Sequence, residues 1–134
     1  MKPLLLLIFL LPISSSLEAQ NTEVNNLFLD DINLAFQNKS PKVIVPHMAE
    51  VVDIHMGNQR ASMTPEEAAV QLSSFFKQYP QGVFKVLKKG LYDEQTAFVM
   101  GIYQHQKGRI MMYIVLDVSQ NKVKIKEFDF GRSH

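Results

Sequence analysis

Four strand-like segments joined by very short turns make up the C-terminal part of this chain. The turns between them include the hairpin-forming sequences Gln106-Lys107-Gly108 and Gln120-Asn121. Because parallel neighbours need a crossover of a dozen or more residues, we expect these segments to pair as an antiparallel meander. The segments are Val83 to Lys88, Thr96 to Gln104, Ile110 to Val118 and Val123 to Phe130.

Helices and a single strand are predicted ahead of the meander. One helix precedes Asn38, on the helical spacing of Val24, Phe28, Ile32 and Phe36. A second begins at Thr64-Pro65-Glu66-Glu67, which forms a capping box, and it ends before Pro80. Its apolar stripe comprises Ala68, Leu72, Phe75, Phe76 and Tyr79.

The segment from Glu50 to Met56 alternates and predicts a strand, with Val52 and Ile54 on one face and Asp53 and His55 on the other. Gly57-Asn58 ends it. The segment just before is ambiguous, because Ser40-Pro41 is a helix-start signal while the β-branched residues 43–45 favour a strand. Together these elements predict an α+β fold in which two or three N-terminal helices pack on an antiparallel sheet.

The two middle strands of the meander are apolar on both faces, which is unusual for an antiparallel sheet. In residues 97–103, Phe98, Met100 and Ile102 lie on one face of the predicted strand, and the residues that alternate with them make the other face equally apolar. Residues 110–116 show the same pattern. Helices can cover only one face. We therefore expect the other face to form a homodimer interface or, with strong curvature, to enclose a ligand.

The N-terminus has the three parts of a secretory signal. Lys2 supplies the positive charge, Leu4 to Leu11 is an unbroken apolar run, and Ala19 is the small residue that a signal peptidase prefers. Eight apolar residues are too few to span a membrane, which takes about 20. We expect residues 1–19 to be the signal peptide and residues 20–134 to be a single exported domain, periplasmic or extracellular, without a stable membrane anchor.

The composition and the net charge exclude several classes of function. The chain contains no cysteine, which excludes disulfides, an N-terminal lipid on cysteine and thiolate chemistry. The net charge is +1 and stays so after cleavage, since one base and one acid are removed with the signal. A near-neutral domain is not expected to capture nucleic acid or anionic lipid.

Several segments resemble one uncharacterised family of small exported bacterial proteins with a nuclear-transport-factor-2-like, or cystatin-like, fold. The resemblance covers nearly all of the mature chain and implies that the antiparallel sheet is curved, which gives the domain a cone-like shape. It implies that Pro41 to His47 is a short second helix, and its superfamily includes isomerases, dehydratases and binding modules. The segments are Val51 to Ile54, Ala68 to Lys77, Phe84-Lys85-Val86 with Gly90, Phe98 to Gly101, and Ile125 to Phe128.

Asp53 and His55 are the candidate catalytic residues. Two positions apart on a strand, they project to the same face. The resemblance implies that an acid and a histidine on this early strand can face the cone and act as general bases. An apolar cone favours the neutral form of a carboxyl group, and an imidazole can exchange a proton near neutral pH, so the pair could move protons. The alternative is that this face of a short edge strand is merely solvated.

Other charged residues suggest no site. His47, His105 and His134 lack the close spacing of metal ligands, so we expect no metal. Lys122, Lys124 and Lys126 form a cationic ridge without interleaved aromatic residues, which is typical of a solvated strand. No phosphate loop or nucleophile elbow is present, and we expect no cofactor.

The leading hypothesis is an exported, non-enzymatic module that binds a small apolar ligand or a protein partner through the helix–sheet cleft or the open sheet face. The alternative is an isomerase- or dehydratase-like enzyme that uses Asp53 and His55 in the cone. The direction in which these two side chains point distinguishes the hypotheses.

Cleavage is predicted after Ala19, within a residue or two, because the small residue follows the apolar run at signal-peptidase spacing. N-terminal sequencing of the exported protein measures this directly. A mature product that still begins at Met1 would contradict it.

Overall fold

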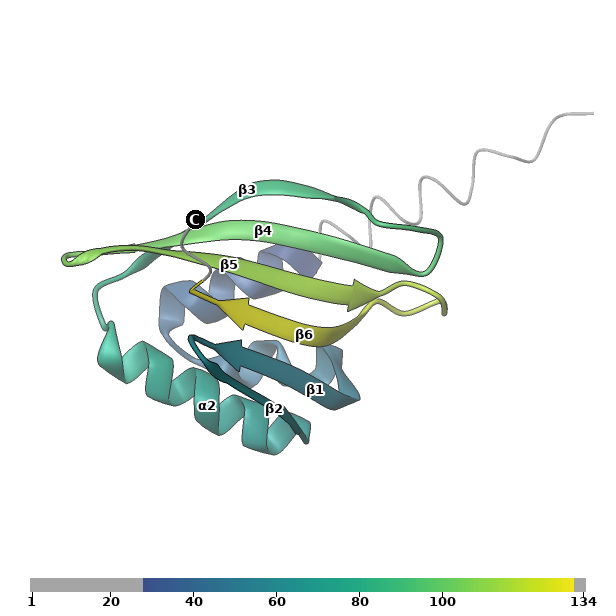
Figure 1. Ribbon diagram of the computed structural model, residues 1–134, viewed down its shortest axis with the longest axis horizontal. Coiled ribbons are helices and arrows are strands. Elements are labelled where there is room, and N and C mark those ends of the chain that lie inside the picture. Colours follow the sequence, from purple (N-terminus) through teal and green to yellow (C-terminus); the bar gives the residue numbers. More distant parts are fainter. Residues whose placement is uncertain (1–27, 132–134) are drawn as a thin grey trace, which may run out of the picture.

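The computed structural model describes residues 28–131, in which helices pack on one face of a six-stranded sheet (Figure 1). A helix occupies residues 28–38, followed by the 3-10 turns η1 (Pro41–Val43) and η2 (Val45–His47) and later by α2 (Pro65–Gln78). The strands are β1 (Met48–Met56), β2 (Gln59–Met63), β3 (Val83–Leu91), β4 (Thr96–His105), β5 (Gly108–Asp117) and β6 (Lys124–Phe130).

The strand order is β2-β1-β6-β5-β4-β3. The predicted α+β fold and the antiparallel meander β3 to β6 are confirmed. The sheet is mixed, because β1 pairs with β6 in parallel (Figure 1). α2 and the meander together form the long connection that a parallel pair requires.

Two local predictions need correction. β1 ends before Gly57 as predicted, but Gly57, with φ of 57°, lies in a hairpin turn, and the unpredicted strand β2 follows it. The sequence analysis did not predict β2, because four of its five residues are exposed and the strand therefore has no apolar alternation. β3 also runs past Lys89-Gly90 to Leu91, with an irregularity in pairing between Val86 and Lys88.

The ambiguous segment forms neither a strand nor one continuous helix. Pro41 and Pro46 each lie in the first two positions of a separate 3-10 turn. A proline ring suits the start of a turn but removes a donor from anything longer. The short second helix implied by the resemblance is therefore divided in two.

α2 forms as predicted. The Thr64 Oγ1 accepts a hydrogen bond from the Glu67 backbone N–H at 3.3 Å, with Pro65 in the first turn. The helix buries Ala68, Leu72, Phe75 and Phe76. The predicted N-terminal part of the first helix, with Val24, lies outside the described residues.

The core lies between the helices and one face of the sheet, here called the inner face. Phe36 of the first helix stacks on Phe84 with ring centroids 4.3 Å apart and meets Phe76 edge-on at 5.1 Å. The Tyr103 hydroxyl, at the end of β4, donates to the Tyr79 carbonyl. A buried phenol thus keeps its hydrogen bond while its ring fills the core.

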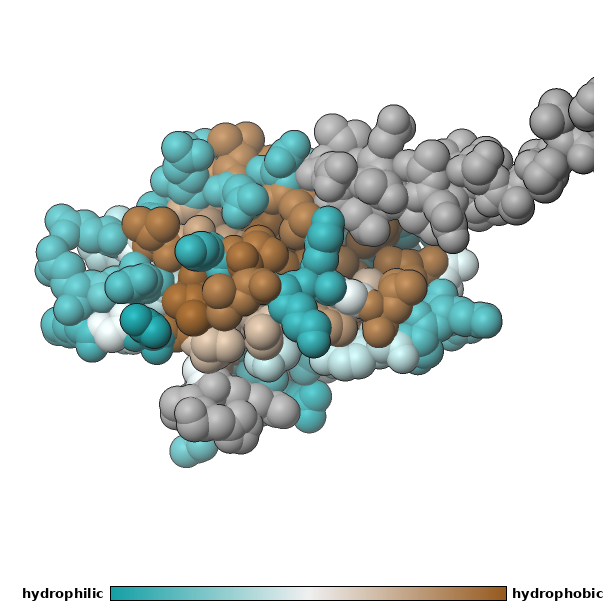
Figure 2. Space-filling view, turned by 90° about the horizontal axis from the view of Figure 1, so that it is seen from above, coloured by the Kyte–Doolittle hydropathy of each residue, from teal (hydrophilic) through white to brown (hydrophobic). Residues whose placement is uncertain are grey.

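The opposite face, here called the outer face, carries half-buried apolar side chains on β4 and β5. Figure 2 shows apolar side chains gathered over this part of the molecule between hydrophilic ones. Both faces of these strands are therefore apolar in the structure, as the sequence predicts. The half-buried residues are Phe98, Met100, Ile102, Met111, Tyr113 and Val115.

Phe76→Ala is expected to lower the free energy of unfolding by about 3–5 kcal/mol, the usual range for emptying a buried aromatic site. Phe76 is 2% exposed, and its ring contacts Phe36 and Phe75. Val70→Ala on the same helix is the control, because Val70 is 63% exposed and should change stability by at most about 0.5 kcal/mol. Urea denaturation measures both, and an unchanged midpoint for Phe76→Ala would show that the stripe is not core.

Candidate functional site

The main candidate site is a cavity of about 350 Å³ between the first helix and the inner face, near the β3–β4 loop. We call it the helix–sheet cleft. Its apolar lining is Phe28, Leu29, Leu91, Ala97, Phe98, Val99, Leu116, Val118 and Val123. Polar groups come from Lys89, Glu94, Gln120 and Asn121, with Gly90 completing the lining.

Short loops at the ends of the strands hold the walls of the cleft in place. The Asp93 carboxylate accepts hydrogen bonds from the backbone N–H groups of Gln95 and Thr96, both at 2.8 Å, and so closes the β3–β4 loop. The Val118 N–H donates to the Gln95 carbonyl at 2.8 Å. This bond ties that loop to the end of β5, so both walls are fixed to each other.

The cleft combines apolar walls with charged groups among its lining. Lys89 and Glu94 are both exposed and contribute an ammonium and a carboxylate, while Ala97 and Val99 are buried. Cavities that bind small molecules typically measure about 300–1,000 Å³ and are mostly apolar with a few polar groups. The arrangement therefore suits a small, largely apolar molecule that carries one polar end.

The predicted pair Asp53 and His55 lies on the outer face, away from the helix–sheet cleft. Val52 and Ile54, which alternate with them, are buried in the core. Asp53 Oδ1 accepts a hydrogen bond from Ser62 Oγ at 2.5 Å. Neither side chain lines the helix–sheet cleft.

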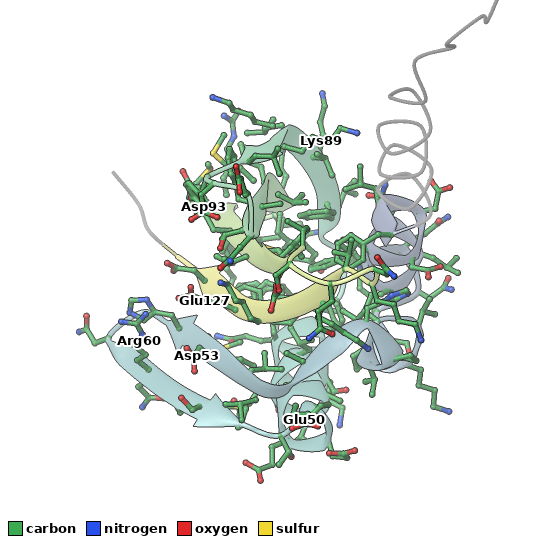
Figure 3. The ribbon with its side chains drawn as sticks, turned by 90° about the vertical axis from the view of Figure 1, so that its right-hand side faces the viewer. Glu50, Asp53, Arg60, Lys89, Asp93 and Glu127 are labelled. Carbon is green, nitrogen blue, oxygen red and sulfur yellow. The ribbon has the colours of Figure 1, made fainter. Side chains whose placement is uncertain are left out.

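A second hollow, here called the outer hollow, opens on the outer face beside this pair. Its volume is about 670 Å³. Figure 3 places Asp53, Arg60 and Glu127 together on the side of the sheet away from the first helix. The lining residues are Arg60, Tyr92, Met111, Tyr113, Val115, Glu127 and Asp129.

Charged contacts organise the outer hollow. Arg60 Nη2 lies 3.3 Å from Glu127 Oε1, and His55 Nδ1 lies 3.6 Å from Asp129 Oδ2. Asp129 is only 7% exposed, and among residues 28–131 it is the one charged residue that is buried. Sequence reasoning missed Arg60, Glu127 and Asp129. The β1–β2 register places Arg60 opposite His55, and the β1–β6 register places Asp129 opposite His55 and Glu127 opposite Asp53.

The other predicted histidines lie apart. His47 Nε2 pairs with Asp31 Oδ2 at 2.7 Å, and the His105 ring lies 4.4 Å from that of Tyr79. His134 lies outside the described residues. Within residues 28–131 no group of three His, Asp or Glu side chains is placed to hold a metal ion.

The predicted lysine ridge is divided among separate contacts. Lys124 Nζ donates to the Pro46 carbonyl at 3.0 Å, and Lys126 Nζ donates to Thr96 Oγ1 at 3.2 Å. Lys122 is exposed. Two of the three ammonium groups therefore serve local packing.

The pKa values that are shifted belong to residues whose side chains make hydrogen bonds within the fold. Burial lowers the pKa of Lys39, whose Nζ donates to the carbonyls of Phe36 and Gly82, and burial raises the pKa of Tyr103. Both lie toward the opposite end of β4 from the cleft. Near the cleft, hydrogen bonds from the Ser119 hydroxyl and N–H lower the pKa of Asp117.

Ser119→Ala is expected to raise the pKa of Asp117 toward the ordinary aspartate value, because it removes the largest cause of the shift. A lowered folded-state pKa stabilises the fold above the unfolded-state pKa and loses that effect as pH falls through the folded-state pKa. The variant should therefore lose less stability on acidification. NMR titration of the Asp117 carboxyl carbon measures the shift, and an unchanged midpoint would contradict this account.

Solved structures with similar folds come from several bacteria. A protein of Bacteroides ovatus ATCC 8483 has a TM-score of 0.69 and 18% identity, covering 78% of this chain and 94% of that one. A cystatin-like domain of unknown function from Nostoc punctiforme has a TM-score of 0.64 and 12% identity, covering 87% and 78%. An NTF2-like protein of unknown function from Shewanella baltica OS155 has 0.61 and 10%, covering 84% and 93%.

These likenesses establish the cystatin-like, NTF2-like fold. No curated protein matches the chain. Within residues 28–131 no helix has the length and apolar character needed to cross a membrane. The family model described as Domain of unknown function (DUF4783) matches residues 29–131, so the chain belongs to that family.

Proposed function

We propose that this member of the DUF4783 family is an exported, non-catalytic module that binds a small, largely apolar molecule in the helix–sheet cleft. The apolar cavity of about 350 Å³ carries the proposal, since its size and lining match those of small-molecule sites. Export rests on the signal-like residues 1–19.

The two ends of the cleft suggest how such a molecule would lie. Apolar side chains of β4 and β5, Ala97, Val99 and Leu116, offer a surface that gains free energy when water leaves it. Lys89 supplies an ammonium beside this surface. An apolar body with an anionic or hydrogen-bond-accepting end is the matching ligand chemistry.

The proton-transfer alternative receives no support from geometry. Asp53 and His55 lie across the sheet from the cleft, because residues of alternating parity on β1 face opposite sides. A ligand in the cleft would therefore contact neither side chain. Binding without chemistry is the function that the cleft supports best.

Ala97→Leu is expected to weaken ligand binding about tenfold or more, because the larger side chain fills part of the cavity. The probe is 8-anilinonaphthalene-1-sulfonate, an apolar anion whose fluorescence rises in such sites. Fluorescence titration of the exported chain gives its dissociation constant. Native mass spectrometry of chain purified from its source shows whether a natural ligand is carried along.

Ala61→Leu provides the matched control, because Ala61 is an exposed residue of β2 outside the cleft. It should leave the dissociation constant unchanged. Equal affinity of the dye for wild type and Ala97→Leu, with unchanged stability, would overturn the proposal.

A further inference from the structure

β3 is a long strand at one edge of the sheet, and one side of its backbone is unpaired. It lies last in the strand order, and it pairs with β4 and with no other strand of residues 28–131. Its nine residues present a row of N–H and C=O groups about 30 Å long. β2, at the opposite edge, has only five residues. A long open edge is the kind of structure to which an extended peptide adds a further strand.

Apolar side chains are exposed along this edge. Among residues 28–131, seven large hydrophobic residues are exposed, of which three lie on β3 and a fourth follows it directly. These four are Val83, Leu87, Leu91 and Tyr92. β3 is uppermost in Figure 1, and Figure 2, which is seen from above, shows apolar side chains between hydrophilic ones on this side. Single exposed apolar residues are common, but several on one open strand are typical of an interaction surface.

The charged residues of β3 are all lysines. Lys85 lies opposite Ile102, and Lys88 lies opposite Met100. Because Leu87 is an extra residue without a partner on β4, both lysines share the outer face although an odd number of positions separates them. All three lysines of the strand are exposed, and none takes part in an ion pair within residues 28–131. The edge therefore carries positive charge that the described part of the chain does not neutralise.

The surroundings of the edge do not reverse this charge. Arg109 on β5 lies opposite Gln104 and adds an exposed cation to the outer face near the start of β3. Asp93 and Glu94 come after the strand ends, and the Asp93 carboxylate already accepts two backbone hydrogen bonds. The carboxylates of the outer face belong to β1 and β6, which lie beyond β4 and β5. A segment that lies along β3 therefore meets basic side chains.

We propose that the free edge of β3 binds an extended acidic segment of another protein as an added strand of the sheet. The backbone N–H and C=O groups of the segment pair with those of β3, which provides affinity. Acidic side chains on its outer face lie beside Lys85 and Lys88, which selects the partner. Its apolar side chains cover Val83, Leu87 and Leu91. This inference is independent of the ligand proposed for the helix–sheet cleft.

The lysines also distinguish an acidic partner from a second copy of the chain. Lysine on an edge strand is a common device against pairing between copies, because like charges directly opposite each other are destabilising. In an antiparallel pair of β3 strands centred on Leu87, Lys85 of one copy would lie opposite Lys89 of the other. An acidic strand meets attraction at the positions where a copy meets repulsion.

Peptide titration tests this docking surface. The probe is a short synthetic peptide in which valine and glutamate alternate, and the NMR amide shifts of the exported chain show where it binds. The largest shifts should fall on β3. Lys88→Glu should raise the dissociation constant about tenfold or more, because it places a carboxylate beside the glutamates of the peptide. Lys122→Glu is the matched control, since it makes the same charge change at an exposed residue between β5 and β6, away from the edge.

Two further peptides separate backbone pairing from charge. The same peptide with every backbone nitrogen methylated keeps its glutamates but has no backbone donors, so it should not bind β3. A peptide with lysine in place of glutamate keeps the donors but is repelled by Lys85 and Lys88, so it should not bind either. Equal binding of the methylated and the unmethylated glutamate peptides would show that charge alone holds them, and strand addition would be wrong.

The remaining outcomes are equally decisive. No binding of the glutamate peptide, equal affinity of the Lys88→Glu and Lys122→Glu variants, or shifts confined to the helix–sheet cleft would overturn the proposal. Phosphatidylglycerol vesicles that bind the chain when the peptide does not would assign the lysines to a membrane surface instead. Both lysines are exposed, so neither change should unfold the domain, and a urea midpoint verifies this. Dye binding in the cleft reports separately on the proposed ligand site.

Discussion

Parallel pairing between β1 and β6 joins the two halves of this chain. The β1–β2 hairpin and α2 precede the meander, and they reach it through a ladder that runs from Asp53 beside Glu127 to Met56 beside Phe130. Val52 and Ile54 enter the core from one side of this ladder, against Phe128 and the residues of α2. Without it, the meander would keep an open edge at β6, and α2 would lose the strand that it contacts most.

Local signals predicted local structure well. The Thr64 cap, the α2 stripe and the four meander strands could all be derived from neighbouring residues, because hairpins and helices are closed by contacts a few positions apart. β2 had no such signal, since its residues are mostly exposed. The β1–β6 pair had none either, since its partners are more than 70 residues apart.

The candidate sites, too, were predicted where neighbouring residues decide and missed where distant segments meet. Alternation on β1 showed that Asp53 and His55 share a face, but only the position of the helices decides which face lines the cleft. The outer hollow needed the register of several strands, which places Arg60 and Asp129 on either side of His55. Side chains from distant segments meet there, so no spacing in the sequence could reveal them.

The irregularity in β3 has a consequence for how the strand can change in length. Leu87 lies between Val86 and Lys88 without a partner on β4, as the extra residue of a bulge does. Removing it would leave Phe84 and Val86 on the inner face, and Lys88 would still pair with Met100. Removing any other residue of the strand would turn its neighbours onto the wrong face. Leu87 is thus the position at which this edge can be shortened by one residue while both faces keep their chemistry, and natural variation in length should concentrate there.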